Sequence, residues 1–296
     1  MDALLAKTIL TKAKSPQQWF GADYGCNLYR GCSHGCIYCD SRSECYHNDN
    51  FSSVMPKKDA LAILNKEMAS KRSKGIIGTG AMSDPYNPLE KKLELTRGLL
   101  SLANHYHFGI TIYTKATLVL RDIDLLQQIS QHSAAVVCMT ITTFDDTLSK
   151  IIEPYAPKTS LRFDALRKLK DAGIVAGIIL MPLLPWINDT PHNLSQIIST
   201  SAKFHLDFIY PMFGVTLRDR QRAYFYERLD HHFPELKQKY QQRFKDNYIC
   251  NSPNIKELST LFKTQCKHHK IPTSMNAIIS LYKTKKVDYE MLSFDL

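Results

Sequence analysis

The chain has 296 residues, a formal net charge of +10 at pH 7, and ordinary shares of hydrophobic (44%) and charged (22%) residues. This length suits a single large α/β barrel. No apolar run reaches the about 18 residues of a membrane helix, and the first residues lack the apolar stretch of a secretory signal. We therefore expect a cytoplasmic protein with no membrane partner. Eight cysteines fit a reducing compartment, where thiols serve metals or catalysis rather than disulfides.

Strand and helix patterns alternate along the first 215 residues. Apolar and β-branched runs predict strands at 26–29, 75–79, 108–113, 134–142, 174–180 and 206–212. Helical periodicity falls between them, at 57–72, 90–105, 121–131, 159–172 and 193–204. Alternation of this kind implies a parallel sheet with right-handed crossovers, either doubly wound or an incomplete barrel. Both arrangements place functional groups at the carboxyl ends of the strands.

Strand signals stop near residue 215. Helical patterns follow at 218–229, 235–244 and 255–268, whereas 271–283 fits neither element clearly. The sequence therefore predicts a core over 1–215, with a lead-in at 1–20, and a basic helical extension over 216–296. The extension holds fifteen Lys and Arg against nine Asp and Glu. Its charge and interleaved aromatic residues are compatible with a nucleic-acid partner, although aromatics at helical spacing more often form a core.

One short loop after the first predicted strand holds Cys32, Cys36 and Cys39. Thiolates are soft ligands that suit iron–sulfur clusters, which normally take four of them, so three leave one iron open to a small molecule. A structural zinc site is the alternative. Its fourth ligand would be Cys26, Cys45 or His34. Structural zinc sites usually combine two separated cysteine pairs, and the sequence lacks a second pair, which favours the cluster.

The spacing C-x-x-x-C-x-aromatic-C, with Tyr38 before the last cysteine, resembles the radical S-adenosylmethionine (SAM) superfamily. Segments 80–90, 113–115, 140–143, 153–157 and 181–189 extend the resemblance to its spore photoproduct lyase-like branch. The resemblance implies a partial (β/α)6 TIM-like barrel with a four-iron four-sulfur (4Fe–4S) cluster on the three cysteines. It also implies an enzyme with an external electron donor of flavodoxin or ferredoxin type. One electron then cleaves SAM to methionine and a deoxyadenosyl radical, which abstracts hydrogen from a substrate.

The end of the second predicted strand is a candidate SAM contact. Gly78, Thr79 and Gly80 would let the backbone approach a ligand closely, and the resemblance places the SAM amino group there. Ser83 and Asp84 follow nearby in sequence. The alternative for Asp84, which precedes a proline, is a plain turn.

Later strand ends supply the other candidate SAM contacts. Lys115 would pair with the SAM carboxylate, and its alternative is an exposed loop lysine. Thr140 and Thr142 end a buried strand, where their hydroxyls need either a ligand or backbone carbonyls. The resemblance implies that Tyr38 packs beside the adenine, and ordinary loop packing is its alternative.

The resemblance implies a nucleic-acid substrate, such as a DNA lesion. One departure concerns the hydrogen donor, because spore photoproduct lyase carries a cysteine directly before its Ser-Asp pair, where this chain has Ala81-Met82. Cys26 precedes the cluster loop and Cys45 follows it, and each is a candidate radical relay with plain packing as the alternative. Cys45 lies close in sequence to the loop and is the candidate catalytic cysteine. The alternatives are radical SAM modification of RNA, a peptide or a small molecule, and a metal-stabilised nucleic-acid-binding module without turnover.

Overall fold

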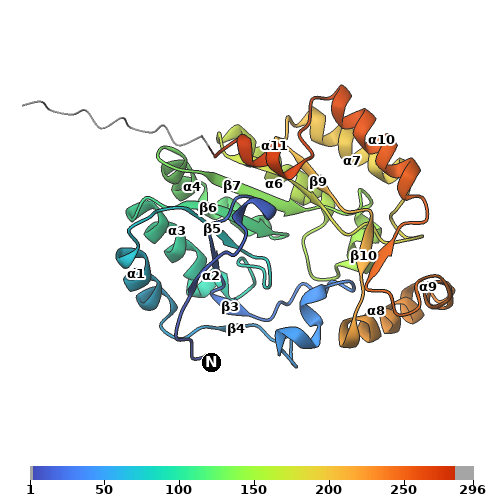
Figure 1. Cartoon of the computed structure of the whole chain (residues 1–296), viewed down its shortest axis with the longest axis horizontal. Helices are drawn as coiled ribbons and strands as arrows, with labels where there is room; N and C mark the ends of the chain where they lie inside the picture. Colours follow the sequence, from blue (N-terminus) through green and yellow to red (C-terminus); the bar gives the residue numbers. More distant parts are fainter. Residues whose placement is uncertain (1–2, 284–296) are drawn as a thin grey trace, which may run out of the picture.

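A computed structural model describes residues 3–283 of the chain. Its centre is a seven-stranded sheet in the order β1-β2-β5-β6-β7-β8-β9 (Figure 1). These strands are Leu10–Lys12, Tyr24–Cys26, Ile76–Thr79, Gly109–Thr114, Ala135–Thr140, Val175–Leu180 and Ile209–Pro211. β1 runs antiparallel to β2, and the other neighbouring pairs in this sheet are parallel. The predicted α/β fold, a partial barrel of parallel strands, is confirmed.

The middle strands of the sheet are buried on both faces. Every residue of β6 and all but the last residue of β7 are buried. A parallel strand covered on both faces reads as a near-continuous apolar run, which is why the sequence predicted these two strands within two residues of their ends.

The first barrel strand lies earlier than predicted. The prediction placed it at 26–29, but β2 ends at Cys26, and Tyr29–Arg30 form β3, which pairs with β4 (Met55–Pro56) in a separate ladder. The strand is only three residues long and has Gly25 at its centre. Glycine weakens the strand pattern in sequence because it has no side chain to pack.

Helices cover the sheet (Figure 1). The α-helices of the barrel are α1 Ala60–Ser70, α2 Glu90–Leu93, α3 Leu95–His105, α4 Ile123–Ser130, α5 Asp146–Ile152, α6 Thr159–Asp171 and α7 Pro191–Lys203. Short 3-10 helices are η1 Pro16–Gln18, η2 Asp40–Arg42, η3 Glu44–Tyr46 and η4 Thr117–Asp122. The helix predicted over 90–105 is two helices, because Glu94 has a left-handed backbone with φ of +49°. No helix within residues 3–283 is long and apolar enough to span a bilayer.

Within the described residues after 213, the chain forms a two-stranded antiparallel ladder and four helices. The prediction that strands stop near 215 is wrong, because β10 (Gly214–Thr216) pairs antiparallel with β11 (Ile249–Asn251). Three residues are too few to show the two-residue alternation by which a strand is recognised. The helices are α8 Asp219–His232, α9 Leu236–Phe244, α10 Ile255–His268 and α11 Met275–Ser280. Residues 284–296 of the predicted extension, and 1–2 of the lead-in, lie outside the described residues.

The C-terminal helices share hydrophobic cores with the barrel. α10 packs on α7, and its Leu258 and Phe262 belong to the same core as the buried residues of β6 and β7. α8 and α9 lie side by side at the lower right of Figure 1. Their Phe225 and Tyr240 form a second core with Ile37 of the cysteine loop. The C-terminal residues therefore pack directly against the part of the chain that carries the cysteines.

Candidate functional site

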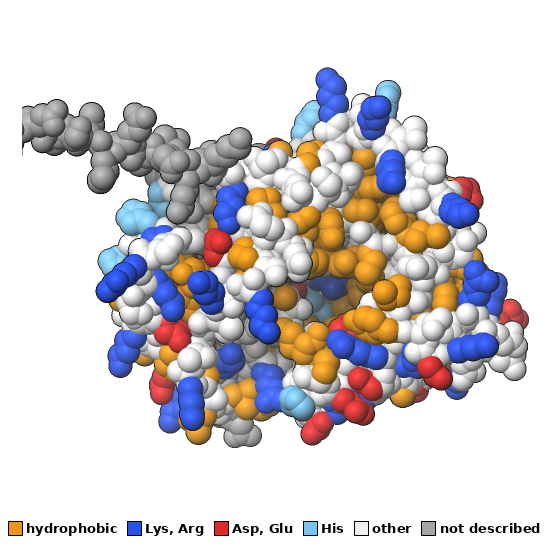
Figure 2. Space-filling view, viewed as in Figure 1, with side chains coloured by type: hydrophobic (Ala, Val, Ile, Leu, Met, Phe, Trp, Pro, Cys, Tyr) orange, Lys and Arg blue, Asp and Glu red, His pale blue; other side chains and the backbone are white. Residues whose placement is uncertain are grey.

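The carboxyl ends of β5, β6 and β7 meet the cysteine loop at one cavity. All three cysteines of the 32–39 segment line it. Gly80 directly follows β5, Lys115 follows β6 and Thr140 ends β7, and each lines the same cavity. Parallel strands place their carboxyl ends at one edge of the sheet, which is why residues distant in sequence converge here. The space-filling view shows the molecule hollowed near its centre, with hydrophobic side chains around the opening (Figure 2).

Backbone packing fixes the start of the cysteine loop. Gly31 has φ of +83°, and a Cβ at this position would stand 2.1 Å from the carbonyl oxygen of Ser53. Directly after it, the Cys32 N–H donates to the Phe51 carbonyl at 2.8 Å. Only glycine fits such a close approach of two backbones. The loop is therefore held against residues 51–53 before its first cysteine.

The three thiols lie in surroundings that suit a soft metal group. Burial raises the pKa of Cys32 to about 11, that of Cys36 to about 12 and that of Cys39 to about 11. Free thiols here are protonated, whereas bound iron would hold them as thiolates. Three cysteines facing one cavity fit the donor set of an iron–sulfur cluster. Within residues 3–283, no three His, Cys, Asp or Glu side chains are arranged to hold a single metal ion.

Asp84 and Ser83 hold neighbouring elements together. The Asp84 carboxylate accepts hydrogen bonds from Thr114 Oγ1 and from the Lys115 N–H, each at 2.8 Å. It also lies 3.4 Å from His34 Nδ1. The Ser83 hydroxyl donates to the Gly31 carbonyl. Both residues line the cavity, but these contacts already link β5 to β6 and to the cysteine loop.

The glycines after Ile77 differ in their surroundings. Gly80 lines the cavity with φ of +100°, and a Cβ there would stand 1.9 Å from the Tyr113 carbonyl oxygen. A Cβ on Gly78 would instead meet Ala22 and the Tyr113 side chain within the sheet. Thr79 is buried at the end of β5. Of the three residues predicted to contact SAM at this strand end, the structure brings only Gly80 to the cavity.

Lys115 lies over Tyr38. Its Nζ is 5.6 Å from the centroid of the Tyr38 ring, a cation–π geometry. Burial alone would lower the pKa of Lys115, but Cys36, when it is a thiolate, and the charge of Glu153 raise it above its ordinary value. The Tyr38 ring is buried, and its hydroxyl donates to Glu153. Lys115 is therefore a positive charge held at the edge of the cysteine cavity.

Glu153 and Arg162 form a buried ion pair next to Thr140 of the cavity, and sequence reasoning selected neither residue. Their side chains are 1% and 0% exposed, and Arg162 Nη1 lies 2.5 Å from Glu153 Oε2. Burial would raise the pKa of Glu153, but the positive charges of Arg162 and Lys115 bring it below its ordinary value. The available signal was a charged residue on the apolar face of α6, where Arg162 precedes Phe163 and Leu166 follows one turn later.

Of the two threonines predicted to contact a ligand at the end of β7, only one lies at the cavity. Thr140 lines the cavity, and its carbonyl accepts from Arg162 Nη1 at 3.0 Å. Thr142 lies beyond the strand and outside the residues that line the cavity. Its carbonyl accepts from the side-chain amides of Asn188 and Asn193 at 2.8 and 3.0 Å. Its hydroxyl is buried without a hydrogen-bond partner among the described residues.

Arg218, which directly precedes α8, and the first residues of that helix bind the segment that follows the cysteines. Arg218 Nη2 donates to Asp40 at 2.6 Å and its Nε to Ser43 Oγ at 3.1 Å. Asp219 Oδ1 accepts from the Glu44 N–H at 3.1 Å. Two further contacts come from Arg220 Nε to the Arg42 carbonyl, at 3.1 Å, and from Gln221 Nε2 to the Tyr38 carbonyl, at 3.2 Å. Residues 218–221 thus brace the cysteine loop from the C-terminal part of the chain.

A groove lined by arginine and tyrosine lies beside the cysteine loop. Its lining residues are Ser33, Gly35, Arg42, Ser52, Pro88, Tyr155, Tyr224 and Arg228. The Arg42 guanidinium lies 4.0 Å from the centroid of the Tyr224 ring, and that of Arg228 lies 5.4 Å from it. Tyr155 is 74% exposed. Other aromatics of the extension, Phe225, Tyr240 and Phe244, are buried in the core.

The remaining cysteines lie away from the cavity. Cys45 is exposed on η3, outside the residues that line the cavity, so the structure does not bring it together with the three loop cysteines. Cys26 is buried in β2 and Cys138 in β7. Cys250 and Cys266 are buried in the C-terminal part, as expected for packing residues.

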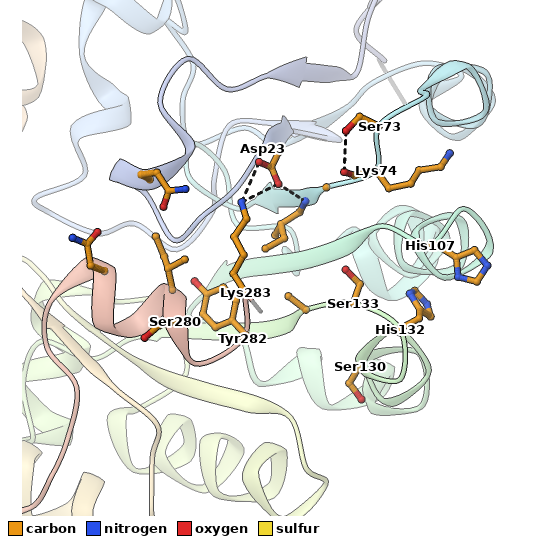
Figure 3. Close-up of a pocket in the computed structure, with 16 residues that line it drawn as sticks. Asp23, Ser73, Lys74, His107, Ser130, His132, Ser133, Ser280, Tyr282 and Lys283 are labelled. Atoms are coloured by element: carbon orange, nitrogen blue, oxygen red, sulfur yellow. Dashed lines mark hydrogen bonds and ion pairs between the residues drawn. The ribbon is translucent and has the colours of Figure 1, made fainter. Parts of the chain in front are cut away.

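A larger cavity, of about 1090 Å³, lies at the opposite edge of the sheet (Figure 3). It is lined by residues at the amino ends of β5 and β7, and by His107 and His132, whose ring centroids are 4.7 Å apart. Asp23 accepts from Lys283 Nζ at 3.2 Å and from the Ile76 N–H at 2.8 Å. The cysteines lie at the carboxyl ends of the strands, so this cavity is separate from the cysteine site.

Comparisons with known sequences agree with the cysteine site. Residues 26–194 match the model of the radical SAM superfamily. An uncharacterised protein of Methanocaldococcus jannaschii is 34% identical over 206 residues, covering 68% of this chain and 77% of that protein. An uncharacterised protein of Acidianus two-tailed virus is 27% identical over 208 residues, covering 66% of this chain and 67% of that protein.

Solved structures show the same fold. A mutant spore photoproduct lyase with bound SAM and dinucleoside spore photoproduct has a TM-score of 0.64 at 15% identity, covering 90% of this chain and 78% of that one. A radical SAM methyltransferase from Kitasatospora setae, with tryptophan and a SAM analogue bound, has a TM-score of 0.57 at 10% identity, with coverage of 86% and 54%. The chain therefore belongs to the radical SAM superfamily and is an enzyme that uses a 4Fe–4S cluster together with SAM.

Proposed function

We propose that Cys32, Cys36 and Cys39 hold the 4Fe–4S cluster and that the enzyme acts on nucleic acid. The observation that carries the ligand assignment is the convergence of these three thiols with Gly80, Lys115 and Thr140 in one cavity at the carboxyl ends of the strands. When bound, the cluster and SAM supply one-electron chemistry that begins with cleavage of SAM. The protein contributes ligands, orientation and shelter from water.

Lys115 is the residue best placed to hold the SAM carboxylate. It is a compact cation whose raised pKa keeps it charged, and it lines the cavity beside the cysteines. Gly80 leaves backbone exposed to a ligand because it carries no side chain. Asp84 and Ser83 would act mainly by fixing these two strand ends, since their polar atoms already bind Lys115 N–H and the Gly31 carbonyl.

Iron content and electron paramagnetic resonance test the ligand assignment. The protein is reconstituted anaerobically, reduced with dithionite and measured with and without SAM. We expect a reduced-cluster signal that changes when SAM is added, and loss of iron in each of Cys32→Ala, Cys36→Ala and Cys39→Ala. Cys45→Ala is the control, because its thiol lies outside the cavity and iron should be retained. A wild-type signal indifferent to SAM would overturn the assignment.

The groove beside the cysteine loop supports a nucleic-acid substrate. Exposed Tyr155 offers a face on which a base would stack, and the cations of Arg42 and Arg228 lie where they would meet phosphates. Ser33 and Gly35, which separate the cysteines, line the same groove. Spore photoproduct lyase, whose fold this chain shares, has been solved with dinucleoside spore photoproduct bound. A strand seated in the groove would therefore lie next to the cluster loop.

Binding of a single-stranded oligonucleotide, followed by fluorescence anisotropy over a range of salt, tests this substrate class. We expect affinity to fall as salt rises. Tyr155→Ala should weaken binding by about tenfold, because loss of one stacked base costs about 1–3 kcal/mol. Lys237→Gln is the control, since this cation pairs with Asp230 on α8, away from the groove. Absence of binding at low salt would favour a peptide or small-molecule substrate instead.

The proposed enzyme needs a reductant from outside the chain. We expect a flavodoxin or ferredoxin to replace dithionite in the assay. Product analysis after SAM turnover would then show whether Cys45, exposed on η3, takes part as a radical relay. In that case Cys45→Ala would retain SAM cleavage while product formation falls.

A further inference from the structure

The ion pair between Glu153 and Arg162 is costly to bury. Both side chains are fully enclosed, and a buried pair compensates for lost hydration only when its remaining polar atoms find partners. Arg162 Nε donates to the Pro157 carbonyl at 2.8 Å and Nη1 to the Thr140 carbonyl at 3.0 Å. Its Nη2 is buried without a partner among the described residues. A purely structural pair would be expected to satisfy every donor.

The segment that carries Glu153 is tied to the cysteine loop at three points. The Ile37 N–H donates to the Ile152 carbonyl at 3.0 Å, and the Tyr155 N–H donates to the His34 carbonyl at 3.1 Å. Between these two backbone bonds, the Tyr38 hydroxyl donates to the Glu153 carboxylate. A change at Glu153 therefore acts on the loop between its first and last cysteines.

Glu153 also balances two cations, the buried Arg162 and the partly buried Lys115. Its negative charge raises the pKa of Lys115, whereas the charge of Arg162 opposes the charge on that lysine. Arg162 reaches the carbonyl of Thr140, a residue that lines the cysteine cavity. The pair thus binds the Tyr38 hydroxyl and places one negative and one positive charge close enough to act on the Cys36 thiol.

We propose that Glu153, held by Arg162, is a positioning residue that orients Tyr38 and, with Arg162, sets the reduction potential of the cluster bound at this site. The inference rests on the proposed assignment of Cys32, Cys36 and Cys39 as ligands. Reduction adds negative charge to a cluster, so a neighbouring anion makes reduction harder and a neighbouring cation makes it easier. Net charge and hydrogen bonding around a cluster are established determinants of its potential.

The test is an anaerobic redox titration of the reconstituted protein without SAM, followed by electron paramagnetic resonance. Glu153→Gln removes the anion and should shift the midpoint potential upward. Arg162→Met removes the cation and should shift it downward. The double variant carries neither charge and should return towards the wild-type potential. The control is Asp164→Asn with Arg167→Gln, an exposed pair at 2.8 Å on the same helix, which should leave the potential unchanged.

Midpoint potentials that shift in opposite directions in the two single variants distinguish an effect of charge from a general loosening of the structure around the cluster. Single variants that keep iron but leave the potential unmoved, or move it in one common direction, would overturn the proposal. If a single variant fails to fold, Tyr38→Phe decides, because it removes only the hydroxyl that donates to Glu153. An unaltered potential and an unaltered SAM-induced signal in Tyr38→Phe would also overturn it. A wild-type protein that binds no cluster would refute the ligand assignment instead.

Discussion

Gly80 joins β5 to the cavity through a backbone conformation that other residues adopt poorly. We predict that Gly80→Ala lowers the free energy of unfolding by about 3 kcal/mol or more, because left-handed strain adds to overlap with the Tyr113 carbonyl. Gly173→Ala is the matched control. Gly173 also has positive φ, of +78°, but a Cβ there meets nothing within 4 Å. Gly173→Ala should lower the free energy of unfolding by about 1–2 kcal/mol, as measured by guanidinium denaturation. Equal losses of stability in the two variants would contradict the close approach of position 80 to the Tyr113 carbonyl.

Glu153 gives the fold a predictable dependence on pH. Its pKa is lowered in the folded state, so its ionic contribution is fully present above the ordinary glutamate pKa of about 4.3 and is lost as pH falls through the lowered value. We predict that Glu153→Gln destabilises the protein by about 3–5 kcal/mol at neutral pH. The gap from wild type should stay level down to about pH 5 and narrow progressively as pH falls below about 4.

Denaturation of both proteins at a series of pH values measures that gap. The charged or titratable groups around Glu153 are Arg162, Lys115, Tyr38, Cys36 and His34. Because both proteins contain all of these groups, the difference between them reports the ionisation of Glu153 together with its effect on these neighbours. A gap that widened as pH fell would mean that the carboxyl is protonated in the native protein.

Single residues show which parts of the candidate site could be predicted from the sequence. Lys115 and Asp84 follow strands that are easily recognised, so their meeting at one edge was foreseeable. Arg162 was not, because its role depends on a buried partner nine residues earlier, across the turn between α5 and α6. Tyr38 was selected for the correct loop, but the direction of its hydroxyl, towards Glu153, depends on tertiary packing.

Among the elements, the N-terminal end of α8 also holds the distant cysteine loop in place through hydrogen bonds. We predict that Arg218→Gln reduces stability by about 1 kcal/mol, because the Arg218–Asp40 pair is about one-third exposed. It should also speed the loss of iron to a chelator, since the segment after Cys39 loses two of its contacts. Absorbance of a chelator–iron complex over time measures this rate. Lys237→Gln, on α9, should leave the rate of iron loss unchanged. An equal acceleration in that variant would contradict the idea that residues 218–221 hold the cysteine loop.

Long periodic elements were predictable and short ones were not. The predicted helix at 255–268 coincides with α10, and the strand at 174–180 differs from β8 by one residue. α5 was missed because it has only seven residues, although Asp145 caps it by accepting from the Thr147 N–H. β10 and β11 are strands because they pair with each other across a long sequence separation, and a pattern of neighbouring residues cannot predict such pairing.

At the scale of the whole molecule, the division into residues 1–215 and 216–296 is an organisational hypothesis that unfolding experiments test. Because Leu258 is fully buried in the barrel core, we predict that Leu258→Ala costs about 2–5 kcal/mol within one cooperative transition. Leu161→Ala, at a site 53% exposed, should stay within about 0.5 kcal/mol of wild type. Two separate transitions, with only one affected by Leu258→Ala, would instead indicate an independent extension.

The brace between α8 and the cysteine loop also fixes an order of events during synthesis. Arg218 and Asp40 are 178 positions apart. At roughly 5–20 residues per second, the ribosome would complete the cysteine loop roughly 10–40 s before it makes the residues that hold it. Over that interval the loop lacks its partners at 218–221. Stable retention of iron is therefore expected only after α8 has emerged, even though the three loop cysteines are made well before it.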